Sequence, residues 1–151
     1  MKLKRVIAAL ISYAALAVWP VAAEEGQSGH PVFFVVTSDQ AQATNDRLEL
    51  SGDVHVTWAK EHPGREAGTI SGSELVKTWQ VGPNSFQADP PNAILTGAGS
   101  EGRVQAVVEL TSSASTNDDL SFTYKLLHGQ IPAQISGASL FIDGGGCGMG
   151  C

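Results

Sequence analysis

The side chains of this chain best suited to chemistry lie together in residues 144–151. Both cysteines, Cys147 and Cys151, occur there with Met149 between them, and glycines fill the other positions. Glycine has no side chain to pack and loses the most conformational freedom on ordering, so these sulfurs are not expected in a hydrophobic core. We expect residues 144–151 to form a flexible Gly/Cys/Met tail.

Metal binding is the first chemistry open to this tail. Thiolate and thioether sulfurs are soft ligands that suit Cu(I), and two thiolates also suit zinc. The tail supplies three such donors, Cys147, Met149 and Cys151. A closed four-coordinate zinc site would need a histidine from the body of the domain or a ligand from a second chain. Cu(I) or zinc is the expected ion, and the choice between them stays open.

A disulfide between Cys147 and Cys151 is the second possibility. Exported thiols meet an oxidising compartment, and a small ring that spans glycines is sterically easy. Such a ring would be passive or would exchange with a partner's disulfide. No Lys, Arg or His lies near the pair in sequence to stabilise a thiolate, which argues against a redox enzyme.

A thiol carrier is the third possibility, because the residues after Ile142 can reach about 30 Å when extended. A glycine-flanked cysteine near the end of an exported β-sandwich resembles the carrier subunit of the periplasmic thiosulfate-oxidising system, whose terminal cysteine bears sulfur intermediates. The resemblance covers about five residues and implies that Cys147, between Gly146 and Gly148, is the carrier thiol. Cys151 departs from that pattern, since it would trap the thiol as a disulfide.

The first 23 residues have the layout of a secretory signal. Lys2, Lys4 and Arg5 precede an apolar stretch, and small residues precede an expected cleavage after Ala23. The alternative is an uncleaved anchor, since Val6 to Ala23 covers 18 residues, close to a bilayer span. Cleavage would place the protein in the periplasm or outside the cell, with no stable membrane span.

The charge of the mature chain limits its partners. Residues 1–23 hold three of the nine basic residues and none of the fifteen acidic ones, so cleavage changes the net charge from −6 to −9. Nucleic acid and anionic lipid would repel such a chain. We expect the partner to be another envelope protein or a soft metal ion.

From His30 onward, apolar residues mostly alternate with polar ones, which predicts strands. The run from Pro31 to Thr37 predicts a fully buried strand. Residues 48–58 predict a hairpin, or one long strand bent at Gly52. Further strands are expected near 69–71, 93–96, 103–110, 120–126 and 138–142, with turns at 97–102 and 117–119.

The sequence pattern of one segment predicts a helix. Ser71 precedes Glu74 by three positions, as in a capping box, and residues 73–80 can form about two turns, with Leu75, Val76 and Trp79 facing the sheet. The expected fold is an all-β antiparallel sandwich, immunoglobulin-like or related, with this short helix; the alternative is a small open β-barrel. The expected boundaries are a signal peptide at 1–23, a polar lead-in at 24–29, the β domain at 30–143 and the tail at 144–151.

The body of the domain shows few signs of catalytic chemistry. His55 and His62 could join Asp53 or Glu61 in a cation site, but their spacing favours isolated surface histidines. Nucleophile-elbow, zinc-protease, P-loop and dinucleotide motifs are absent from the sequence. We therefore expect an exported, non-enzymatic accessory or binding protein of the bacterial cell envelope that acts through its tail. The alternatives are a periplasmic sulfur carrier that serves a separate enzyme and a structural or adhesive module with a passive disulfide.

Overall fold

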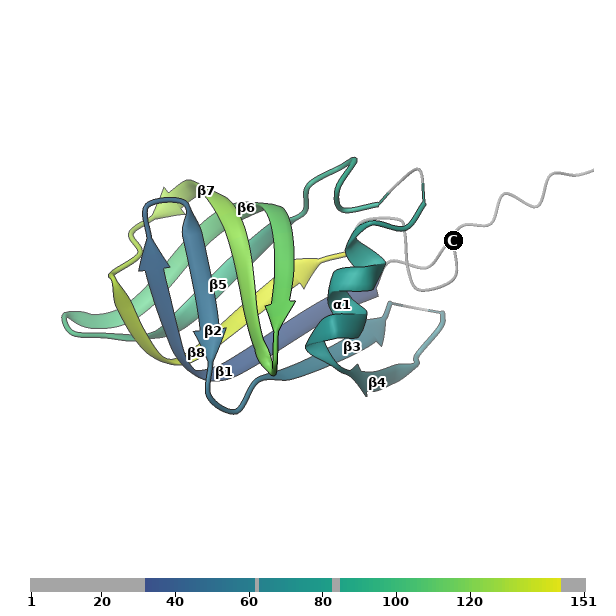
Figure 1. Cartoon of the computed structure of the whole chain (residues 1–151), viewed down its shortest axis with the longest axis horizontal. Helices are drawn as coiled ribbons and strands as arrows, with labels where there is room; N and C mark the ends of the chain where they lie inside the picture. Colours follow the sequence, from purple (N-terminus) through teal and green to yellow (C-terminus); the bar gives the residue numbers. More distant parts are fainter. Residues whose placement is uncertain (1–31, 62, 83–84, 145–151) are drawn as a thin grey trace, which may run out of the picture.

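The computed structural model describes residues 32–61, 63–82 and 85–144. This part of the chain is nearly all β-structure with one short helix, as expected. The elements in chain order are β1 (Val32–Thr44), β2 (Arg47–Ser51), β3 (His55–Lys60), β4 (Ala67–Ile70), α1 (Gly72–Trp79), β5 (Asn92–Gly99), β6 (Gly102–Thr116), β7 (Asp119–Gly129) and β8 (Gln134–Asp143) (Figure 1). The predicted signal peptide and polar lead-in, and all of the tail after Gly144, lie outside the described residues.

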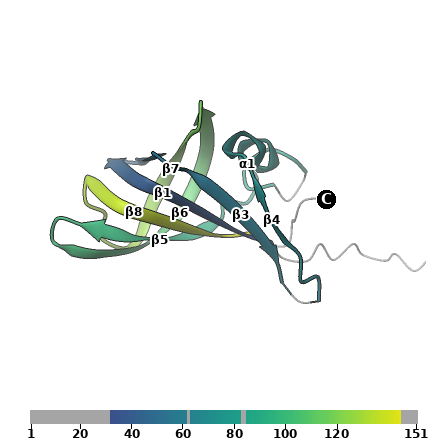
Figure 2. The ribbon, with the colours of Figure 1, turned by 90° about the horizontal axis from the view of Figure 1, so that it is seen from below.

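Six strands form a closed antiparallel barrel in the order β1–β2–β7–β6–β5–β8, with β8 paired back to β1. The ring closes because one edge of β1 has two neighbours: Gln40 to Thr44 pair with β2, and Val32 to Thr37 pair with β3. Strands β3 and β4 continue the sheet outside the ring (Figure 2). All eight strands of the described part thus belong to one sheet, which supports the barrel alternative, in closed rather than open form. The expected sandwich is not confirmed, because it requires two separate sheets.

Strands β2 and β3 follow each other along β1 and are interrupted at Gly52. Both run antiparallel to β1, so the bent-strand interpretation of residues 48–58 is confirmed and the hairpin interpretation is wrong. Gly52 has φ of +90°, and a Cβ at this position would lie 2.7 Å from Cβ of Asp39. Only glycine fits this bend without strain.

Alternate residues of the barrel strands face inward and form the core. Ala138, Leu140 and Ile142 of β8 show this alternation, with at most 1% of each residue exposed. Short turns join the long strands: Asn117 adopts φ of +55° between β6 and β7, and Asn45 adopts φ of +43° between β1 and β2. These left-handed residues match the twist that a tight hairpin requires.

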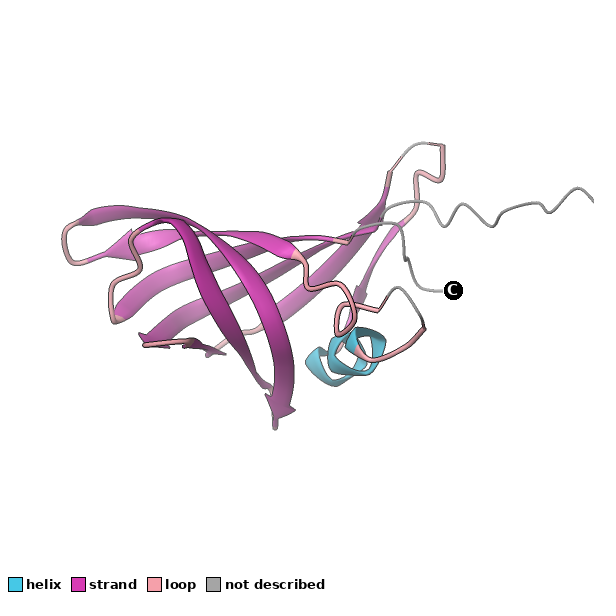
Figure 3. Ribbon diagram, turned by 90° about the horizontal axis from the view of Figure 1, so that it is seen from above, coloured by secondary structure: helices cyan, strands magenta, loops and turns pink. Residues whose placement is uncertain are grey.

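The helix covers one end of the barrel, beside the outer strands (Figure 3). Its capping box forms as predicted, because the Ser71 hydroxyl accepts a hydrogen bond from the Glu74 N–H and the Glu74 carboxylate accepts one from the Ser71 N–H. Leu75 and Trp79 are buried, and the Trp79 ring centroid lies 4.8 Å from that of Phe86 and 5.6 Å from that of Phe122. Aromatic packing therefore anchors α1 to the barrel core. Among the described helices, none is long and apolar enough to cross a membrane.

Candidate functional site

The sulfur ligands predicted from the sequence, Cys147, Met149 and Cys151, lie outside the described residues. The metal site, the carrier thiol and the disulfide therefore stay predictions. The structure does describe the strand from which this segment leaves the barrel.

Strand β8 leads into the tail and is hydrogen-bonded to a neighbouring strand on each of its two edges. Its last residues pair with β1 at Phe33–Asp143 and with β5 at Ala93–Ile142. Gly144 follows and is buried against β1, where an added Cβ would overlap the backbone carbonyl of Val32. A residue with a side chain does not fit there, so the sulfur-bearing segment begins at a closely packed point of the barrel.

An apolar groove of about 570 Å³ lies beside this point, on the outer face of β1, β8, β5 and β6. Phe33, Ile94 and Phe141 line it and are 37%, 43% and 47% exposed. Val35 and Val107 complete its apolar surface, and Asp143 lies at its edge. An exposed apolar surface of this kind is typical of a contact site for another molecule.

The groove was not predicted from the sequence. The prediction that residues 31–37 form a fully buried strand was wrong, because Phe33 points outward and Phe34 points into the core. The signal was present in the uninterrupted apolar run, because a barrel strand with apolar residues on both faces exposes half of them.

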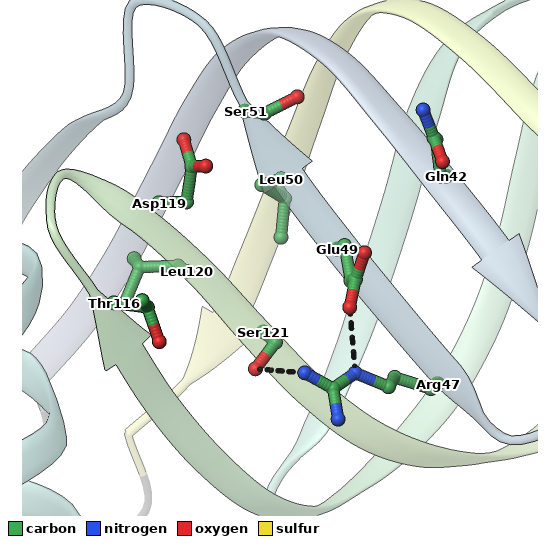
Figure 4. A pocket seen from close by; sticks show the side chains of 9 residues that line it. All are labelled: Gln42, Arg47, Glu49, Leu50, Ser51, Thr116, Asp119, Leu120 and Ser121. Carbon is green, nitrogen blue, oxygen red and sulfur yellow. Dashed lines mark hydrogen bonds and ion pairs between the residues drawn. The ribbon is translucent and has the colours of Figure 1, made fainter.

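A second hollow, of about 380 Å³, lies between β2 and the β6–β7 hairpin (Figure 4). Arg47 dominates it: its Nε lies 2.8 Å from Oε1 of Glu49, and its Nη2 donates to Oγ of Ser121 at 3.4 Å. Asp119 also lines the hollow. Glu49 already pairs with the guanidinium and Asp119 adds a second carboxylate to the lining, which disfavours an anionic ligand. The exposed Arg47–Glu49 pair is of a kind that contributes little stability. We interpret this hollow as a solvated polar surface.

The shifted titratable groups belong to the fold and not to either hollow. Hydrogen bonds from the backbone N–H and the hydroxyl of Ser71 hold the pKa of Glu74 below its usual value. Burial, and then the charge of Asp46, raises the pKa of Tyr124. These shifts follow from helix capping and core packing, since neither residue lines the groove or the polar hollow.

The histidines of the described part are dispersed. His55 Nε2 lies 3.1 Å from Oδ2 of Asp53, and both side chains are exposed. His128 lies at the far end of β7, while His30 and His62 lie outside the described residues. Within residues 32–61, 63–82 and 85–144, no group of three or more His, Cys, Asp and Glu residues is placed to hold a metal ion.

Comparisons of the chain with protein-family models, curated proteins and solved structures find no match.

Proposed function

We propose that this chain is an exported, non-enzymatic binding protein of the bacterial cell envelope, whose barrel presents the sulfur ligands of residues 147–151 to a soft metal ion. One observation carries the proposal. The strand that leads into this segment is hydrogen-bonded on both edges up to Ile142, so the base of the tail is held in place.

The donor chemistry supports a soft ion. Cys147 and Cys151 supply thiolates and Met149 a thioether, a set that prefers Cu(I) and also accommodates zinc. Glycines between the donors let the backbone wrap an ion without a preformed pocket. The barrel contributes position, because it determines where on the protein surface these ligands begin.

Metal titration tests this proposal. The exported protein is reduced, stripped of metal and titrated anaerobically with Cu(I), and separately with zinc, against a coloured chelator of known affinity. We expect stoichiometric binding by the native chain and its loss in the double variant Cys147→Ser/Cys151→Ser. The matched control, His55→Ala/His128→Ala, removes the described histidines and should bind as the native chain does.

Metal binding by the cysteine variant equal to that of the native chain would overturn the proposal.

The intact mass of the protein purified from its envelope distinguishes metal binding from the two alternative functions, the sulfur carrier and the passive disulfide. Added sulfur on Cys147 would support the carrier function. A mass two hydrogens lower, with no metal uptake before reduction, would support a passive disulfide. The same spectrum shows whether cleavage occurs after Ala23.

A further inference from the structure

The outer face of the barrel carries an apolar row that crosses four neighbouring strands. Val35 on β1 lies opposite Phe141 on β8, Phe141 lies opposite Ile94 on β5, and Ile94 lies opposite Val107 on β6. Each of the four lies between two buried residues of its own strand and therefore points outward. These side chains line the apolar groove, so the row is open to contact.

The rows on the two sides of this apolar row differ in hydrogen-bonding chemistry. Asp143 and Glu109 bring carboxylates to one side, on β8 and β6. On the other side the same two strands carry Ser139 and Gln105, which bring a hydroxyl and an amide. The first side also holds Phe33 and Asn92, and the second also holds Thr37 and Thr96. Both carboxylates therefore lie on one side of the row, and every residue on the other side has a group able to donate.

We propose that this face is the interface of a homodimer, in which a second copy packs across a two-fold axis parallel to the apolar row. A rotation about that axis keeps each strand opposite its own copy and exchanges the two flanking rows. Phe141 then packs on Phe141 of the partner subunit. Asp143 faces the partner's Ser139, and Glu109 faces the partner's Gln105. Acceptors thus meet donors on both sides of an apolar centre.

Glu109 already accepts a hydrogen bond from Lys125 at 2.9 Å. A carboxylate has about four lone-pair sites, so it can accept a further bond from an amide. An axis perpendicular to the row would instead gather the four carboxylates of the two copies along one side. It would set Glu109 opposite the partner's Phe33, which cannot donate a hydrogen bond. The arrangement of charge therefore selects one of the two symmetric packings.

The tail of the same chain is a poorer occupant of the groove. Burial of Met149 would contribute about 1.5–3 kcal/mol. Ordering residues 145–149, mostly glycine, would cost about 1–2 kcal/mol for each residue. The cost exceeds the gain, which leaves the face available to a second copy.

The size of the face sets the expected strength of the dimer. It holds three outward residues on each of β1, β8, β5 and β6. A standard interface has about 20–30 residues on each side and buries about 800 Å² per partner. We therefore expect reversible association at micromolar concentration. Added salt should strengthen it, because both copies are acidic and screening reduces their mutual repulsion.

Sedimentation velocity between 1 and 300 µM tests the interface without metal, on the Cys147→Ser/Cys151→Ser variant. We expect a concentration-dependent dimer, at least tenfold weaker in Phe141→Lys and equally weak in Ile94→Lys. Leu127→Lys is the matched control, because Leu127 is 52% exposed and lies outside the groove. Circular dichroism verifies that each variant is folded.

A monomer at every concentration, or a folded Phe141→Lys variant that associates normally, would overturn the dimer. So would a monomer that becomes a dimer only after deletion of residues 145–151, because the tail would then be the occupant. A dimer of the native chain that takes up no metal would overturn the proposed function and leave the dimer standing.

Discussion

The packing of Trp79 offers a sharp test of how the helix is held on the barrel. The side chain is 2% exposed and contacts Phe86 and Phe122, yet its indole Nε1 has no hydrogen-bond partner in the described part of the chain. Replacement by alanine removes the anchor and leaves a cavity, at a cost of about 3–5 kcal/mol. Replacement by phenylalanine removes two ring carbons, at about 1.6 kcal/mol, and also an unsatisfied N–H worth about 1–3 kcal/mol.

The two Trp79 variants should therefore differ strongly in stability. We expect the free energy of unfolding of Trp79→Phe to lie within about 1.5 kcal/mol of the native value. The loss of buried ring carbons destabilises the variant, whereas the removal of the unsatisfied N–H stabilises it. Trp79→Ala should unfold at a urea concentration lower by about 2–3 M, for an m-value of about 1.5 kcal/mol/M.

Urea unfolding followed by far-UV circular dichroism measures both changes, since tryptophan fluorescence would itself be altered. A loss above about 3 kcal/mol in Trp79→Phe would refute the reasoning, because it would show that the indole N–H makes a favourable bond. A loss below about 1 kcal/mol in Trp79→Ala would show that the helix does not depend on this anchor.

Three further predictions concern the cap, the bend and the base of the tail. Ser71→Ala should cost about 1 kcal/mol through loss of the helix cap. Because the pKa of Glu74 is lowered in the folded state, its contribution to stability is present above the ordinary glutamate value of 4.5 and is lost as pH falls through the folded-state pKa. Glu74→Gln should therefore flatten the acid limb of stability measured against pH, and an unchanged limb would contradict this. Gly52→Ala should cost more than about 1 kcal/mol, because φ is +90° and Asp39 occupies the space; the control, Gly137→Ala, has φ of +56° but nothing within 4 Å and should cost less. Gly144→Val should cost about 1–3 kcal/mol and speed hydrogen exchange at Ile142 and Asp143, whereas Ser136→Val at an exposed site of β8 should not. Native exchange rates in Gly144→Val would count against the packed base.

Local sequence signals predicted the elements well. The capping box of Ser71 and Glu74 predicted the start of α1, and the alternation of Ala138, Leu140 and Ile142 predicted the inward face of β8. Such signals are reliable because capping and alternation depend on residues only a few positions apart.

Local signals did not predict which strands pair. The sequence suggested a sandwich because short alternating strands are common to sandwiches and barrels. The barrel closes because β1 is long enough to pair with β3 along one half and with β2 along the other. This division depends on the bend at Gly52 and on contacts between residues far apart in the chain.

The sequence by itself determined the inward and outward faces of most strands, since these depend on residue type and short spacing. The sulfur chemistry of residues 147–151 and the export were predicted on the same kind of local evidence and stay predictions. Only the tertiary structure decided that Val35, Phe141, Ile94 and Val107 form one row beside the base of the tail. Val35 and Phe141 come from strands at opposite ends of the domain's sequence, and Phe141 is far in sequence from Ile94; the hydrogen bonds of the sheet bring all four residues into register. A surface assembled in this way has no signature within any single segment, because most of its parts become neighbours only when β8 pairs with β1 and β5.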